Sequence, residues 1–346
     1  MNILTGMTLK ELEVAARSLG LERWRAKAIL AWVHRRGAES FEAMTDLSPA
    51  MRVRLASAFT FRATSVAFRR ASPDGTTKFL IRVAGGDAVE TVLIPDGARR
   101  TICLSTQVGC PIRCVFCASG MNGLKRNLTA AEIVEQILHV QQETDRPISN
   151  LVIMGIGEPL LNYEHLVRAL SIMNAPWGLG IGYHRITLST VGILDRLEEL
   201  VAAGVKPNLA LSLHAPNDAI RQRVVPTLPK VRVEHIIEAG RTYKRRTRKD
   251  VTCEYVLLAG INDAPEHAAQ LAQLLRGSGL KVNVIPWNRV AELPYREPSA
   301  ARAVAFAAVL KRGGVPVTVR KRKGDEIAAA CGQLRASFAE RSLRPA

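Results

Sequence analysis

Short apolar runs alternate with amphipathic helical stretches from about residue 100 onward, and this alternation restricts the fold more than any other feature of the sequence. The runs that have the length of buried strands are residues 101–108, 150–154, 185–189, 208–213, 252–258, 282–286 and 315–320. Because parallel strands need a helical crossover, six strand–helix units in succession predict an α/β fold, a partial (β/α)6 version of the eight-fold barrel. A doubly wound sheet is the alternative, since periodicity alone does not separate the two folds.

A smaller region of different character precedes these units. Residues 8–36 have apolar residues at helical spacing, with a capping-box pattern at Thr8 and Glu11, and Ser48 followed by Pro49 predicts a further helix. Residues 78–83 and 88–94 read as strands joined by Gly-Gly-Asp, a hairpin signal. We therefore predict a small N-terminal helical accessory domain at 1–65, a β-hairpin linker at 66–95 and a core at 96–346.

The charge balance favours a polyanionic partner. The chain has 48 Lys and Arg against 31 Asp and Glu, a net charge of +17 without a long basic tail, which indicates RNA or DNA rather than a basic surface that only keeps the protein soluble. We find no signal-peptide pattern and no apolar window of membrane-spanning length, so we expect a cytoplasmic protein. Stable disulfides are disfavoured there, so the six cysteines read as metal ligands, reactive thiols or core residues.

Three of these cysteines stand in one loop directly after the first predicted strand, and they are Cys110, Cys114 and Cys117. Clustered thiolates bind a soft metal, so zinc and an iron–sulfur cluster are the candidates. A structural zinc takes four ligands, and no fourth Cys or His lies nearby in the sequence. A cubane cluster with three cysteines would keep one iron open to an outside ligand that carries an amino and a carboxylate group.

Polar residues and glycines recur where the later strands end. Gly157 and Glu158 follow the second strand, where a glycine lets a ligand approach the backbone and a carboxylate accepts hydrogen bonds from an ammonium. The later strands end on, or are followed by, Ser189, Ser212, Leu213, His214 and Asn288. Each alone would be an ordinary turn, strand cap or core residue. Because the carboxyl ends of parallel strands share one edge, their recurrence predicts a single ligand site.

The spacing of the three cysteines, with Phe116 before the last one, resembles the signature of the radical S-adenosylmethionine (SAM) superfamily. Five longer stretches extend the likeness in order over nearly the whole chain: residues 103–110, 154–162, 212–218, 285–288 and 324–334. Together they resemble the RlmN/Cfr family of rRNA adenine methyltransferases. The resemblance implies a radical SAM barrel, a 4Fe-4S cluster on the loop cysteines, and SAM bound at the open iron and at the strand-end residues.

The same resemblance implies roles for three further residues. Cys331, in the C-terminal segment, would receive a methyl group from one SAM. A second SAM would supply the 5′-deoxyadenosyl radical, which removes a hydrogen atom from that S-methyl group. A radical is needed because an adenine carbon is too weak a nucleophile to attack SAM directly. Cys103 would be the resolving thiol, which releases the product by forming a disulfide with Cys331. Glu90 would accept the ring proton, with a solvent-facing strand carboxylate as the alternative, and Cys253 reads as a core residue.

We expect the substrate to be C2 of an adenosine in 23S rRNA, with tRNA as a second substrate, an electron donor such as flavodoxin, and a monomeric enzyme. Methylation at C8 by the antibiotic-resistance type of the same family is the first alternative, and a non-enzymatic iron-sulfur RNA-binding protein is the second. The basic runs 244–249 and 320–323 are candidates for phosphate contacts, with solvated helix ends as the alternative for the first.

Overall fold

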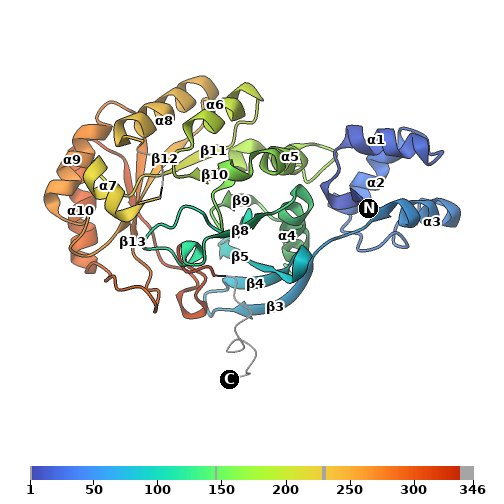
Figure 1. Cartoon of the computed structure of the whole chain (residues 1–346), viewed down its shortest axis with the longest axis horizontal. Helices are drawn as coiled ribbons and strands as arrows, with labels where there is room; N and C mark the ends of the chain where they lie inside the picture. Colours follow the sequence, from blue (N-terminus) through green and yellow to red (C-terminus); the bar gives the residue numbers. More distant parts are fainter. Residues whose placement is uncertain (1, 145, 228–230, 336–346) are drawn as a thin grey trace.

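One large sheet dominates the computed structural model, which describes residues 2–144, 146–227 and 231–335. Among these residues the sheet has ten strands in the order β14-β13-β12-β11-β10-β9-β6-β5-β4-β3 (Figure 1). The parallel strands are β6 (Arg99–Cys103), β9 (Asn150–Ile153), β10 (Ile186–Thr190), β11 (Asn208–Ser212), β12 (Val251–Leu257), β13 (Lys281–Pro286) and β14 (Val317–Val319). Their order follows the chain without a reversal, so the open partial barrel is confirmed and the doubly wound alternative is wrong.

Helices cover the outer side of the parallel strands (Figure 1). They are α4 (Ala130–Gln142), α5 (Tyr163–Asn174), α6 (Leu194–Ala202), α8 (Val233–Thr247), α9 (Pro265–Leu275) and α10 (Ala300–Arg312). The short helix α7 (Asp218–Val224) instead packs against the loop that contains the three cysteines, where Val115 N–H donates to the carbonyl of Val224. Helix α4 begins at a reciprocal capping box between Thr129 and Glu132, which satisfies two backbone donors. Single helical turns lie at η1 (Leu4–Gly6), η2 (Ala84–Gly86), η3 (Ala118–Gly120), η4 (Pro159–Asn162), η5 (Tyr183–Arg185) and η6 (Asp325–Ile327).

An antiparallel meander extends the sheet beyond β6. It consists of β3 (Ser65–Ala71), β4 (Thr77–Arg82) and β5 (Ala88–Asp96), and β5 pairs with β6 so that Val92 lies opposite Cys103. The predicted hairpin corresponds to β4 and β5. Strand β3 was not predicted, because all seven of its residues are exposed and its sequence has no alternation of apolar and polar residues.

The first predicted strand, 101–108, is wrong in its extent. Strand β6 ends at Cys103, and the next strand, β7 (Gln107–Gly109), pairs with β8 (Leu124–Asn127) in a separate sheet. Between them the backbone N–H of Leu104 still donates to Val152 of β9, whereas that of Thr106 donates to Ile156, so the chain then follows the loop after β9. An apolar run does not reveal this change of partner.

The N-terminal lobe contains α1 (Leu9–Ser18), α2 (Arg25–His34), α3 (Pro49–Ala58) and the short parallel strands β1 (Asn2–Ile3) and β2 (Phe59–Thr60). It projects to one side of the barrel (Figure 1). The buried Glu135 of α4 joins the two parts, accepting hydrogen bonds from the hydroxyls of Thr5 and Thr64. The division at residues 65 and 95 remains a prediction.

In the described residues no helix combines the length and apolar character that a membrane crossing requires.

Candidate active site

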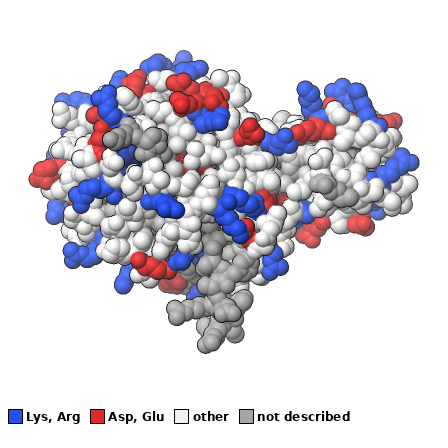
Figure 2. All heavy atoms as spheres, viewed as in Figure 1, with Lys and Arg blue, Asp and Glu red and all other residues white. Residues whose placement is uncertain are grey.

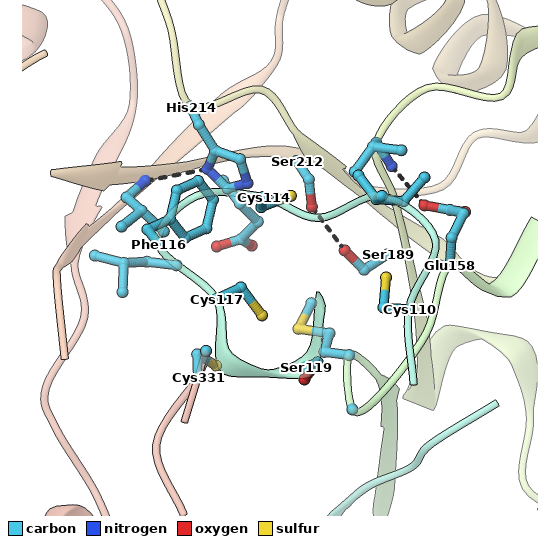
Figure 3. Close-up of a pocket in the computed structure, with 18 of the residues that line it drawn as sticks. Cys110, Cys114, Phe116, Cys117, Ser119, Glu158, Ser189, Ser212, His214 and Cys331 are labelled. Atoms are coloured by element: carbon cyan, nitrogen blue, oxygen red, sulfur yellow. Dashed lines mark hydrogen bonds between the residues drawn. The ribbon is translucent and has the colours of Figure 1, made fainter. Parts of the chain in front are cut away.

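A pocket lies at the carboxyl ends of the parallel strands, where the sequence predicted a ligand site. Ten of the predicted site residues line it: Cys110, Cys114, Cys117, Gly157, Glu158, Ser189, Ser212, His214, Asn288 and Cys331. Leu213 does not line the pocket, because its side chain is fully buried in the main core. Cys331 lies on the Cys117 side of the pocket, away from His214 and Ser212 (Figure 3).

The loop that carries the three cysteines is shaped by its own backbone. Cys110 N–H donates to the carbonyl of Gly123 at 2.9 Å, and Cys117 N–H donates to the carbonyl of Cys114 at 3.1 Å. Arg113 adopts a left-handed φ of 53°, and a side chain at Gly120 would stand 2.7 Å from its Cα atom. The loop therefore needs glycine at this close approach.

Burial governs the protonation of the three thiols. It raises the pKa of Cys110 to about 12, and it also raises the pKa values of Cys114 and Cys117. Thiols in such surroundings are neutral until a cation compensates the charge of their thiolates. Although all three line one pocket, no group of three metal-binding side chains is already assembled within the described residues. Soft ligands on one loop, facing a pocket that has room for a further ligand, fit a 4Fe-4S cluster.

Glu158 is a buried carboxyl that faces this pocket with an exposure of 2%. One oxygen accepts the backbone N–H of Val191 at 2.9 Å, and the other accepts that of Leu160 at 3.1 Å. Burial raises the pKa of Glu158 to about 7, against the lowering effect of these hydrogen bonds. A ligand ammonium in the pocket would favour the carboxylate form, which suits the amino group of SAM.

Gly157 is required by close packing against the neighbouring loop. Its φ is +113°, and a Cβ atom there would lie 2.7 Å from Cβ of Gln107. The Gln107 amide oxygen in turn accepts the backbone N–H of Glu158 at 2.8 Å. Gln107, which the sequence did not single out, therefore positions the carboxyl group through the backbone.

Strand-end hydroxyls and an imidazole complete the polar wall. The hydroxyls of Ser189 and Ser212 are 3.1 Å apart. The Nδ1 atom of His214 accepts the backbone N–H of Val256 at 3.2 Å, and burial lowers the pKa of His214 to about 3. The ring is therefore neutral with its proton on Nε2, and it packs edge-on against Phe116 at 4.8 Å between ring centroids. This wall offers a hydrogen-bond donor beside an aromatic face.

Asn288 connects the pocket to the C-terminal segment. Its Nδ2 donates to the carbonyl of Cys331 at 3.0 Å, whereas its buried Oδ1 has no hydrogen-bond partner among the described residues. An unpaired buried acceptor costs stability unless a ligand donates to it. The amino groups of SAM fit this requirement, so the observed residues are compatible with both implied cofactors.

A second pocket adjoins the first and shares Met154, Ile285, Asn288, Arg320 and Cys331 with it. Cys103 lines only this second pocket, and both Cys103 and Cys331 are free thiols. Burial, followed by the neighbouring Cys331, raises the pKa of Cys103 to about 12, while Arg320 acts in the opposite direction. The two lone cysteines that the sequence singled out are thus brought to one place.

Glu90 lines neither pocket, although its strand β5 pairs with β6 so that Val92 lies opposite Cys103. Lys78 Nζ contacts its carboxylate at 2.8 Å, and the backbone N–H of Arg335 donates to it at 2.6 Å. Burial raises the pKa of Glu90, and Lys78 opposes that effect. Glu90 is therefore a buried and paired carboxyl, not the solvent-facing one considered as the alternative.

The two basic runs differ in their surroundings. In the first, Lys244 lies in the last turn of α8 and donates to the carbonyl of Gly279, as expected for a helix end. The second, 320–323, lines the second pocket together with Arg99. Figure 2 shows Lys and Arg spread over the barrel and the N-terminal lobe rather than gathered in one patch.

Sequence reasoning missed two arginines beside the pockets, the buried Arg221 and the half-buried Arg320. Arg320 was treated as part of a basic run, but its side chain lines both pockets. Arg221 donates to the carbonyls of Ser212 and Val191 at 2.9 and 2.5 Å, which fixes two strand ends beside the pocket. No local pattern marks either residue, because burial depends on strands far away in the sequence.

Comparison with known proteins agrees with this geometry. A family model for the radical SAM superfamily matches residues 104–272, and one for the ribosomal RNA large subunit methyltransferase N-terminal domain matches residues 1–61. The chain is 48% identical to the probable dual-specificity RNA methyltransferase RlmN of Rhodopirellula baltica, over 98% of this chain and 92% of that protein. It is 44% identical to the same-named protein of Thermotoga maritima, over 97% and 98%. A crystal structure of a radical SAM methyltransferase from Sphaerobacter thermophilus superposes with a TM-score of 0.94 at 40% identity, covering 97% of this chain and all of that one.

Proposed function

The chain belongs to the RlmN family of radical SAM RNA methyltransferases, and on this premise we propose that it methylates C2 of an adenosine in 23S rRNA and also modifies tRNA. The premise makes it an RNA-methylating enzyme that uses a 4Fe-4S cluster and SAM. The position of the methyl group, the two RNA classes and the route through a methylated cysteine are the proposal. The relatives' description as dual-specificity RNA methyltransferases supports the pair of substrates.

The position of Cys331 carries the proposal. This residue lines the pocket that fits SAM and also the second pocket, where Cys103 and the basic run lie. Its backbone is held at the junction by the hydrogen bond from Asn288. A thiol at that junction can receive a methyl group on one side and present it to an RNA base on the other. The base must be unpaired or flipped to enter.

Separate groups of residues would hold the cluster and SAM. Cys110, Cys114 and Cys117 would hold the cluster, which when bound supplies the electron that cleaves SAM. Gly157 and Glu158 would hold the amino group of SAM, and Ser189, Ser212, Leu213 through its backbone, His214 and Asn288 would bind its remaining polar groups. The pocket lining and the hydrogen-bonding capacity described above support these assignments for every residue except Leu213, which does not line the pocket.

Cys331 would carry the methyl group and, after loss of a hydrogen atom, join it to the adenine carbon. Cys103 would then release the product by attacking the Cys331 sulfur. Glu90 would accept the ring proton, and burial, which raises its pKa, would favour that protonated state. A small redox protein such as flavodoxin would donate the electron to a monomeric enzyme.

Three cysteine variants test the division of roles on reconstituted enzyme with RNA. With Cys331→Ala we expect neither protein-bound methyl nor methyladenine. With Cys103→Ala we expect Cys331 to be methylated and to stall as a covalent protein–RNA adduct on a denaturing gel. Cys253→Ala is the matched control, because this buried free thiol lines neither pocket.

Nucleoside digestion and mass spectrometry of the product RNA then locate the methyl group. We expect 2-methyladenosine, whereas 8-methyladenosine would assign the chain to the C8 alternative. Equal turnover by the Cys103→Ala and Cys331→Ala variants would contradict the methylcysteine route. RNA binding without SAM cleavage by the wild-type enzyme would favour a non-enzymatic iron–sulfur protein.

A further inference from the structure

The half-buried side chain of Arg320 lies where the two pockets meet. Arg320 directly follows β14, and its backbone N–H donates to the carbonyl of Val284 at 2.8 Å. Its neighbours in the basic run differ from it, because Arg322 pairs with Glu297 and Lys323 pairs with Asp96 near the surface. Arg320 is thus the member of the run that lines both pockets, whereas the other three line only the second.

The acidic groups that act on Arg320 are the Cys331 thiol, the Glu254 carboxyl and the Cys103 thiol. An arginine side chain stays protonated in proteins, so a half-buried one favours ionisation of the acids around it. Glu254 lines the first pocket and accepts a hydrogen bond from Asn283 at 2.8 Å. The two thiols line the second pocket, where the target base would enter.

The surroundings of Cys103 change during the proposed reaction. In the free protein, burial and the ionisable Cys331 oppose its thiolate, while Arg320 and a hydrogen bond from the backbone of Met154 favour it. Once the Cys331 sulfur carries carbon as a thioether, it has no proton to lose. The opposing influence of Cys331 then disappears, and the charge of Arg320 remains.

Resting on the function proposed above, we propose that Arg320 is a positioning residue that holds Cys103 as the thiolate when Cys103 attacks the Cys331 thioether. In that step a bond forms between the two sulfurs, and the bond from the Cys331 sulfur to the methylene carbon breaks. Its electron pair passes to the carbon, which takes up a proton and becomes the methyl group. The two sulfurs are oxidised to a disulfide while the carbon is reduced, so the electrons balance. Attack requires a thiolate, and for this reason the cation matters.

Other charges around Cys103 are less suited to this role. The second pocket is also lined by Asp96, Arg99, Lys321, Arg322 and Lys323. Lys323 and Arg322 have carboxylate partners, and Arg99 and Lys321 belong to a rim that RNA phosphates would occupy. Screening by water and salt weakens the charges of the exposed Arg99 and Lys321 more than that of the half-buried Arg320.

The test compares Arg320→Gln, Arg320→Lys and the exposed charge-loss control Arg312→Gln in reconstituted enzyme that is already methylated on Cys331. A single turnover with RNA is followed by the decay of the covalent adduct on denaturing gels between pH 6.5 and 9. We expect Arg320→Gln to form the adduct but to resolve it about tenfold more slowly at neutral pH, equivalent to about one pKa unit, and to accelerate as the pH rises. Arg320→Lys should stay close to wild type.

A second readout does not depend on turnover. In the Cys331→Ala background, alkylation of Cys103 by iodoacetamide is measured against pH by peptide mass spectrometry. Arg320→Gln should raise the pH of half-maximal alkylation by about one unit. An unchanged midpoint, or a variant that loses only RNA affinity, would overturn the role of Arg320. Absence of any adduct with Cys103→Ala would instead refute the proposed function, while the alkylation midpoint still tests the coupling between Arg320 and Cys103.

Discussion

Replacing Gly157 with alanine should damage both the stability of the chain and its binding of SAM. The backbone φ of +113° is strained for any residue with a side chain, at about 1–3 kcal/mol. The added Cβ would lie 2.7 Å from Cβ and 2.9 Å from Oε1 of Gln107, so that side chain must move. Moving it breaks the buried hydrogen bond to the backbone of Glu158, at about 1–3 kcal/mol more. The expected total is about 2–6 kcal/mol of unfolding free energy.

Binding should suffer because the backbone of Glu158 loses its support. A charge-assisted hydrogen bond contributes about 1.5–3 kcal/mol, which corresponds to a roughly ten- to hundredfold weaker affinity for SAM. Denaturant unfolding measures the first effect, and calorimetric titration of reconstituted enzyme with SAM measures the second. Gly204→Ala is the control, since Gly204 also has a positive φ, +73°, but no atom within 4 Å of an added Cβ. If the two variants unfold alike and bind SAM alike, the packing argument is wrong.

Two further predictions concern charge. Burial raises the pKa of Glu158 to about 7, and an ammonium favours its ionised form, so SAM affinity should rise about fivefold from pH 6 to pH 7 and then level off. The Glu158→Gln variant should not show this rise. A calorimetric titration series in which the wild-type affinity is constant over this pH range would contradict the prediction. Lys321→Ala should lower the salt slope of RNA binding by about 0.7–0.9 if it contacts one phosphate. Arg322→Ala removes ion pairs with Glu297 and Asp325, so it should lower thermal stability but change the salt slope of RNA binding little. Filter binding at several salt concentrations measures the slope for each variant. Equal slopes for Lys321→Ala and Arg322→Ala would refute the different roles of the two residues.

Much of the site was predictable because its parts are local in the sequence. The loop from Cys110 to Cys117 contains all three thiols proposed as cluster ligands within eight residues, and parallel strands bring their carboxyl ends to one edge whatever the details of packing. The predicted residues at the ends of those strands, from Gly157 to Asn288, accordingly line one pocket, with Leu213 as the exception. The prediction that Cys103 and Cys331 act together came from the family resemblance, and their place in one pocket agrees with it.

Other features depended on partners that no local pattern names. Strand β3 is exposed along its whole length, so periodicity could not mark it. The run 101–108 divides between two sheets because its backbone leaves β9 after Leu104 and pairs with β8 from Gln107. The buried carboxylate of Glu90 is paired with Lys78 and accepts a hydrogen bond from the backbone of Arg335 in the C-terminal segment, and neither partner is close to it in the sequence.

The sequence by itself determined the alternation of parallel strands and helices, the thiols proposed as cluster ligands and the chemistry available at the strand ends, because periodicity, capping and motif spacing act over a few residues. Only the tertiary structure decided which charges are buried. Arg320 and Lys321 are adjacent in the same basic run, yet the first lines both pockets and the second lines only the outer one. The physical reason is that desolvation of a side chain depends on strands and segments that are hundreds of residues away, and burial sets the strength of every charge in the site.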